Sequence, residues 1–128
     1  MNQFDQLWPI GTVENSVTET IAPDEIRRVP SRILLDPQLE LGLQGLEPGQ
    51  HIMVLFRFHR APPEYELLQH PRGDKSRPRR GIFALRSPQR PNRIGVTTVE
   101  LIKIEGNILH VRNLDAINGT PILDIKPA

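Results

Sequence analysis

Frequent prolines and glycines limit this chain to short secondary-structure elements. The 128 residues include 13 prolines and 9 glycines, and each proline removes a backbone donor and disrupts a helix interior. The segments between these breaks contain short apolar and β-branched runs that are typical of strands. The pattern therefore predicts a mainly β fold, a small antiparallel β-barrel with one or two short helices. Because no repeat or linker is evident, we expect residues 1–128 to form a single domain.

The expected strands are apolar runs bounded by turn residues. Residues 51–59, HIMVLFRFH, form the most apolar run, which favours a central strand covered on both faces. Residues 96–104 and 108–112 flank Glu105-Gly106-Asn107 and predict a hairpin. Further strands are expected at 8–13, 31–35 and 121–127. A short helical segment is expected after Asp36-Pro37, and an irregular loop over residues 14–28.

Composition excludes several classes of site. The chain has no cysteine, which excludes disulfides, thiolate metal sites and a cysteine nucleophile, and fits a reducing cytoplasm. No apolar run reaches the length of a membrane span. The four histidines show no close metal-ligand spacing, so we expect no metal. The dinucleotide, P-loop, zincin and nucleophile-elbow motifs are also missing, so a nucleotide-like ligand would have to be held by loops of a β fold.

Basic residues concentrate in one part of a nearly neutral chain. The formal net charge is +1, yet residues 57–93 hold ten Lys and Arg residues and only three acids. Such a segment favours a polyanionic partner that is met on one face. Alternatively, the arginines balance acids of the same fold, such as Glu64, Glu66 or the Asp24-Glu25 pair. Within this segment, residues 72–80 have the composition of a mobile basic loop.

The stretch GIFALRSPQRPNRIG, Gly81 to Gly95, combines an apolar run with a cationic loop. We expect a strand at residues 82–85 to lead into the loop and another strand to leave it. Two prolines restrict the backbone, so three arginines are presented as preorganised donors to a carboxylate, a phosphate or a nucleotide. A basic surface turn without a ligand is the alternative.

This stretch closely resembles the signature of the TsaA/TrmO family. The downstream sequence LDAINGTPILDIKP resembles the second hallmark of that family, and WPIGTV and HIMVLFRFHRA lie where the family has matching strands. The resemblance extends from Trp8 to Pro127 with the motifs in order. It implies a homodimeric β-barrel that binds S-adenosylmethionine (SAM) without a Rossmann fold. It also implies an enzyme, a SAM-dependent methyltransferase that N-methylates threonylcarbamoyl-modified adenosine beside the tRNA anticodon.

The resemblance also implies which residues contact the cofactor. These positions match the family's SAM contacts in this sequence: His59, Arg60, Arg86, Val96, Ala116, Ile117, Asn118 and Gly119. The loop backbone would bond the adenosine part, and the cationic side chains would orient the methionine carboxylate. His59 could equally be a hydrogen-bonded structural residue. Asp124 is a candidate proton acceptor, although a structural pair with Lys126 or an arginine is slightly favoured.

A second set of residues is expected to bind tRNA through its phosphates. These cations occur in segments broken by proline and too polar for a core: Arg72, Lys75, Arg77, Arg79, Arg80 and Arg90. Arginine and lysine on such a surface position the RNA backbone without reading bases.

Several positions depart from the family pattern. Asp24-Glu25 replace an Arg-Gln pair near the expected cofactor, and Arg93, Asn118 and Met53 replace a proline, an aspartate and an aromatic residue. We expect these departures to affect the choice of methyl acceptor more than the fold of the barrel or its SAM site. The alternatives are a methyltransferase of the same fold with a small-molecule or protein acceptor, and a non-catalytic nucleotide- or RNA-binding barrel.

Overall fold

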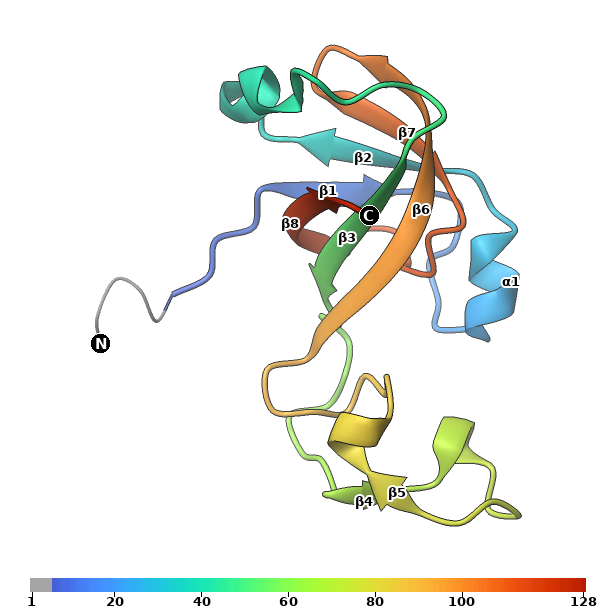
Figure 1. Ribbon diagram of the computed structural model, residues 1–128. Helices are drawn as coiled ribbons and strands as arrows, with labels where there is room; N and C mark the ends of the chain where they lie inside the picture. Colours follow the sequence, from blue (N-terminus) through green and yellow to red (C-terminus); the bar gives the residue numbers. More distant parts are fainter. Residues whose placement is uncertain (1–5) are drawn as a thin grey trace.

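Six antiparallel strands form a closed barrel. The computed structural model describes residues 6–128. The barrel strands are β1 (Gly11–Glu14), β2 (Ser31–Leu35), β3 (His51–Arg57), β6 (Ile94–Glu105), β7 (Ile108–Arg112) and β8 (Pro121–Pro127). They close in the order β1-β2-β7-β6-β3-β8 (Figure 1). The predicted antiparallel barrel is confirmed, and the strands at 31–35, 108–112 and 121–127 have the expected bounds.

Helical structure within residues 6–128 is limited to one α-helix, α1 (Pro23–Arg27), and the 3₁₀ segments η2 (Pro37–Leu43), η3 (Pro71–Gly73) and η4 (Ile82–Ala84). The prediction of an irregular loop over residues 14–28 was wrong, because α1 lies there. Pro23 occupies the first turn, where its missing N–H is not needed. Asp24 at the start and Arg27 at the end suit the helix dipole. Five residues are too few to produce a readable helical period.

The barrel has one apolar interior, and this corrects the expectation for β3. Ile52, Val54 and Phe56 are buried, whereas the alternating residues of β3 are at most half-buried. A closed barrel has only one interior face, so the second apolar face of β3 lies on the outside. The outer residues Leu55 and Met53 therefore form part of the barrel surface rather than a second core.

A glycine allows an aromatic ring to fill the barrel where β3 meets β6. Gly95 pairs with Phe56 across the two strands. A Cβ atom built on Gly95 would lie 2.7 Å from the Phe56 ring and 2.8 Å from the Phe58 ring. The two rings stack edge to face with centroids 5.2 Å apart. Any side chain at position 95 would therefore displace this aromatic pair.

Residues 58–93, between β3 and β6, form an appendage outside the barrel (Figure 1). It contains a small sheet of its own, β4 (Leu68–Gln69) paired with β5 (Arg80–Gly81). The prediction of a strand at residues 82–85 was wrong, because Ile82–Ala84 form the 3₁₀ segment η4. Ile82 is buried but Phe83 is exposed. Ile82 alone anchors the 3₁₀ turn by its burial, so residues 82–85 do not need to pair with another strand.

The basic segment 72–80 has defined turns, which corrects the expectation of a mobile loop. Asp74 Oδ1 accepts hydrogen bonds from Ser76 N at 2.9 Å and Ser76 Oγ at 2.6 Å. His70 Nδ1 donates to the carbonyl of Arg77 at 2.8 Å. These bonds close the segment between β4 and β5. Its cations are therefore presented from a folded turn.

In residues 6–128, no helix combines the length and apolar character needed to cross a membrane.

Gly95→Ala tests the aromatic packing of the barrel. We expect the free energy of unfolding to fall by about 1–3 kcal/mol, because the new methyl group forces Phe56 and Phe58 to move. Urea denaturation measures the change. Gly81→Ala is the matched control, since a Cβ atom there meets nothing within 4 Å, and we expect it to change stability by less than about 0.5 kcal/mol. Equal stability of the two variants would contradict this account of Gly95.

Candidate functional site

The loop of residues 116–119 is held against the chain that follows β1. Asn118 N donates to Val17 O at 2.7 Å, and Gly119 N donates to Val13 O at 2.7 Å. Ala116 and Ile117 are buried, whereas Asn118 and Gly119 are exposed. The amides of residues 118 and 119 are therefore used by the fold. Asn118 also exposes its side chain, so this residue is the part of the loop most open to a ligand.

Asn15, the first residue after β1, also holds this loop. Its Nδ2 donates to Ala116 O at 2.8 Å and to Ser31 Oγ at 3.0 Å, and its Oδ1 accepts from Val17 N at 3.0 Å. Asn15 N also donates to Asn118 Oδ1 at 3.0 Å. The Asn15 side chain thus fixes both the chain that follows β1 and the loop at 116–119. Sequence reasoning missed Asn15 because nothing local distinguishes it from a surface asparagine.

Asp115 connects the same loop to β6 and to α1. One oxygen of its carboxylate accepts a hydrogen bond from Thr97 Oγ1, and the other oxygen lies 3.0 Å from Arg27 Nη2. The Asp115 side chain is only 17% exposed. In addition, Ile26 of α1 packs on Ile117 in a small apolar cluster. The loop, α1 and β6 are therefore one connected unit.

Val96 lies on the outer face of β6, half-buried, next to the buried Thr97. Thr97 bonds Asp115, which directly precedes the loop at 116–119. That Val96 and this loop contact the same cofactor stays a prediction. Val96 pairs with Leu55 of β3, and Leu55 pairs with Asp124 of β8. Val96 and Asp124 therefore flank Leu55 on the outer face of the barrel.

Asp124 already has two partners. Its Oδ2 lies 3.3 Å from Lys126 Nζ, and its Oδ1 accepts from Ile125 N at 2.9 Å. The favoured structural pair with Lys126 is thus present. Half of the side chain remains exposed.

His59 and Arg60 follow β3 directly, and both are exposed. Partial burial of the imidazole and the positive charge of Arg60 lower the pKa of His59 from its ordinary value, against an opposing hydrogen bond to the backbone of Arg57. The lowered pKa favours the neutral imidazole. A carboxylate that arrives beside His59 would reverse this balance and favour the protonated form.

The loop that carries Arg86 is fixed by two other arginines. Arg90 Nη1 donates to Leu85 O at 3.0 Å and to Ser87 O at 3.2 Å. Arg93, at φ 51°, donates from Nη1 to Ala61 O at 3.1 Å. Arg86 itself is exposed and carries no hydrogen bond within residues 6–128. The loop is therefore held by hydrogen bonds, as expected of a rigid loop. The Arg86 guanidinium remains available to a ligand, whereas Nη1 of Arg90 is already used in hydrogen bonds within the loop.

The basic turn of the appendage reaches α1. Arg72 Nη1 lies 3.6 Å from Asp24 Oδ2, and Arg27 Nη1 lies 3.4 Å from Asp24 Oδ1. One carboxylate thus holds two guanidinium groups together. The remaining predicted RNA-binding cations of this turn are exposed and form no ion pair within residues 6–128: Lys75, Arg77, Arg79 and Arg80. Asp24, which departs from the family pattern, therefore pairs with the turn through Arg72, whereas Glu64 and Glu66 form no ion pair with it within residues 6–128.

The donors available here fit SAM chemically. Exposed cations at the end of β3 and on the Arg86 loop suit a carboxylate. The exposed Asn118 side chain and the half-buried Val96 suit an adenosine. No group of three metal-ligating side chains occurs in the described part of the chain.

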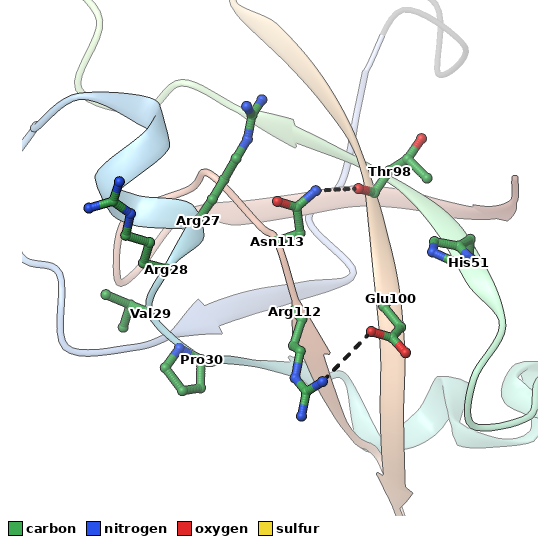
Figure 2. Close-up of a pocket in the computed structure, with 9 residues that line it drawn as sticks. All are labelled: Arg27, Arg28, Val29, Pro30, His51, Thr98, Glu100, Arg112 and Asn113. Atoms are coloured by element: carbon green, nitrogen blue, oxygen red, sulfur yellow. Dashed lines mark hydrogen bonds and ion pairs between the residues drawn. The ribbon is translucent and has the colours of Figure 1, made fainter.

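A separate cavity of about 470 Å³ lies on the outer face of the barrel (Figure 2). Its lining comes from the end of α1 and the segment after it, from β3 and β6, and from the end of β7 and the residue after it: Arg27, Arg28, Val29, Pro30, His51, Thr98, Glu100, Arg112 and Asn113. None of the predicted site residues lines it. Sequence reasoning missed the cavity because Arg27, Arg28 and Arg112 lie in segments whose net charge is negative or neutral.

Comparison with known proteins identifies the family of this chain. Residues 16–128 match the model of the tRNA-methyltransferase O N-terminal domain. A probable S-adenosyl-L-methionine-binding protein of Methanocaldococcus jannaschii is 42% identical over 123 residues, which cover 94% of this chain and 89% of that protein. The human tRNA (adenine(37)-N6)-methyltransferase is 41% identical over 102 residues, 78% of this chain but 22% of the enzyme.

Solved structures agree as well. TrmO from Pseudomonas aeruginosa superposes with a TM-score of 0.75 at 30% identity, covering 100% of this chain and 56% of the solved chain. This chain thus spans little more than half of that structure. The family match covers most of the residues and the relative from M. jannaschii is similar along nearly its whole length. The chain therefore belongs to the family of the tRNA-methyltransferase O N-terminal domain.

Proposed function

We propose that this chain is a SAM-dependent methyltransferase whose acceptor is the N6 atom of an adenosine in tRNA, beside the anticodon and carrying a threonylcarbamoyl group. Family membership and the names of its relatives support the coarse activity. The observation that carries the proposal is the hydrogen bond between Thr97 and Asp115. This bond joins β6, which follows the motif Gly81–Gly95, to the loop of the second motif, LDAINGTPILDIKP.

The residues have separate roles in this proposal. The loop at 116–119 and Val96 hold the adenosine part of SAM, and His59, Arg60 and Arg86 orient its carboxylate. SAM supplies a methyl group that is already activated, so the protein acts mainly by positioning the acceptor for in-line transfer. Asp124 is constrained by Lys126 and Ile125, which supports a structural role over that of a proton acceptor.

The protein is proposed to act as a homodimer. A second copy related by a two-fold axis would bring one subunit's appendage beside the other's cofactor loop. The protruding appendage with exposed Phe83 and Leu67 is consistent with such an arrangement. Light scattering that finds only the 14.6 kDa monomer at micromolar concentration would contradict it.

Two measurements test the proposed function. Calorimetry with SAM separates a methyltransferase from a non-catalytic RNA-binding barrel. Mass spectrometry of tRNA nucleosides from a deletion strain identifies the acceptor. Loss of one methylated adenosine supports tRNA as the substrate, whereas an unchanged nucleoside profile together with SAM binding points to another acceptor.

Arg86→Ala tests the contact with the carboxylate. We expect SAM binding to weaken by about 1.5–3 kcal/mol, because a charge-assisted hydrogen bond is lost. Calorimetry measures the affinity, and Arg77→Ala is the control because Arg77 is also exposed but lies on the basic turn. Unchanged affinity in a folded Arg86→Ala protein would remove this residue from the site.

His59 makes SAM binding depend on pH. The lowered pKa of the free protein should rise when a carboxylate binds, so binding takes up a proton. SAM affinity of the parent should therefore increase, relative to His59→Gln, as the pH falls from about 8 to about 6. The ionisations of SAM itself affect both proteins equally. Parallel pH profiles would show that His59 does not face the carboxylate.

The basic turn is expected to act on the acceptor alone. Replacing Arg77, Arg79 and Arg80 by Gln should leave SAM affinity nearly intact. Binding to unfractionated tRNA should weaken, and its logarithmic salt dependence should flatten by roughly 0.7–0.9 per lost phosphate contact. Fluorescence titration at three salt concentrations measures both. A parent-like slope would contradict a contact between this turn and RNA.

A further inference from the structure

The turn that carries His59 and Arg60 lies where the chain leaves the barrel. The appendage begins directly after β3 and ends directly before β6 (Figure 1). Ala61 N donates to Phe58 O at 3.1 Å, which closes a four-residue turn with His59 and Arg60 at its centre. The Phe58 side chain packs against the core of the barrel, so the first end of this turn is anchored there.

Arg93 holds both ends of the turn. Its carbonyl oxygen accepts from Phe58 N at 2.8 Å, and its Nη1 donates to Ala61 O at 3.1 Å. Arg93 is half-buried, which favours a defined position of the side chain. The second end of the turn, at Ala61, is therefore fixed by a guanidinium group.

The backbone conformation of Arg93 excludes the proline of the family pattern. Arg93 lies at φ 51°, in the left-handed region that residues other than glycine rarely adopt. Its N–H donates to Arg90 O at 3.2 Å. A proline has no N–H and a φ of about −65°, so it could neither adopt this conformation nor form this bond. A disfavoured conformation persists where surrounding contacts determine it, and such positions cluster at ligand sites.

Arg93 also connects the turn to the loop that carries Arg86. Arg90, which accepts the Arg93 amide, donates from Nη1 to the carbonyls of Leu85 and Ser87, on either side of Arg86. The groups proposed to orient the carboxylate thus come from two segments that are bonded to one another through Arg93.

We propose that Arg93 is a positioning residue, whose side chain fixes the His59–Arg60 turn for the methionine carboxylate of SAM. The proposal rests on the proposed function, in which His59 and Arg60 orient that carboxylate. The Arg93 guanidinium acts through Ala61 O and does not itself contact the ligand. Without this bond, the Phe58 end of the turn stays anchored and the Ala61 end is released, so His59 and Arg60 lose their common orientation.

Arg93→Met tests this role, because it removes the donor and keeps an unbranched side chain. Two thioethers of adenosine are the probes: S-adenosylhomocysteine has the amino-acid carboxylate, and 5′-methylthioadenosine lacks it. We expect calorimetry to show about five- to tenfold weaker binding of S-adenosylhomocysteine and parent-like binding of 5′-methylthioadenosine. Arg93→Lys keeps the charge and a donor and should recover most of the lost affinity. Arg28→Met is the matched control, because Arg28 is an exposed arginine outside both segments; it should bind both probes like the parent.

A double-mutant cycle separates positioning from direct contact. In a protein that carries His59→Gln and Arg60→Gln, we expect Arg93→Met to cause no further loss of affinity for S-adenosylhomocysteine, because the groups that Arg93 positions are already gone. A further loss of the same size would show that the Arg93 guanidinium contacts the ligand itself, and would overturn the positioning role.

The outcomes separate this inference from the proposed function. Parent-like binding of S-adenosylhomocysteine by a folded Arg93→Met protein, or an equal loss for both thioethers, would overturn the inference and leave the methyltransferase proposal standing. A parent that binds neither thioether would count against the proposed function itself. A parent that binds both thioethers equally would remove the carboxylate contact, and the inference with it. Circular dichroism checks the fold of each variant, and Arg93→Gln is subject to the same criteria if Arg93→Met does not fold.

Discussion

The closure of the barrel between β1 and β8 depends on hydrogen bonds from outside the strand ladder. The two strands share only the residue pairs Gly11–Ile122 and Thr12–Pro121. Beyond them, the chain after β1 is held by the loop at 116–119, through Gly119 N to Val13 O and Asn118 N to Val17 O. Asn15 reinforces this seam with bonds to Ala116 O and Ser31 Oγ. Because the two strands share only two residue pairs, the contacts that extend this seam also fix the proposed cofactor loop.

The proposed site has two parts that differ in how they are held. The loop at 116–119 is rigidly built into the barrel through the seam, through Thr97–Asp115 and through Ile26–Ile117. Arg86 belongs to the appendage, which meets the barrel mainly at the ends of β3 and β6 and through the exposed Arg72–Asp24 pair. An exposed ion pair contributes little to stability. The barrel part of the proposed site is therefore held by more contacts than the appendage part.

Local patterns predicted the barrel well and the connections between distant segments poorly. From apolar runs bounded by Gly, Pro and Asn, the sequence analysis predicted the observed bounds of β2, β7 and β8. The same reasoning wrongly predicted a strand at Ile82–Leu85 and burial of both faces of β3. An apolar run alone does not show how many of its faces pack against other residues. The family motifs predicted that Val96 and the loop at 116–119 contact the cofactor, and this stays a prediction. Asn15, Asp115 and the cavity of Arg28 and Arg112 depend on contacts across up to about a hundred residues, as Asn15–Ala116 illustrates with a separation of 101.

The central claim is that the seam of the barrel positions the cofactor loop, and Asn15→Ala tests it most directly. Measuring SAM affinity by calorimetry, with circular dichroism and urea denaturation on the same protein, separates binding from folding. The account predicts a folded barrel, destabilised by about 1–3 kcal/mol through the unpaired Ala116 carbonyl and Val17 amide, that binds SAM at least several-fold more weakly than the parent. A folded Asn15→Ala protein with the SAM affinity of the parent would contradict the claim.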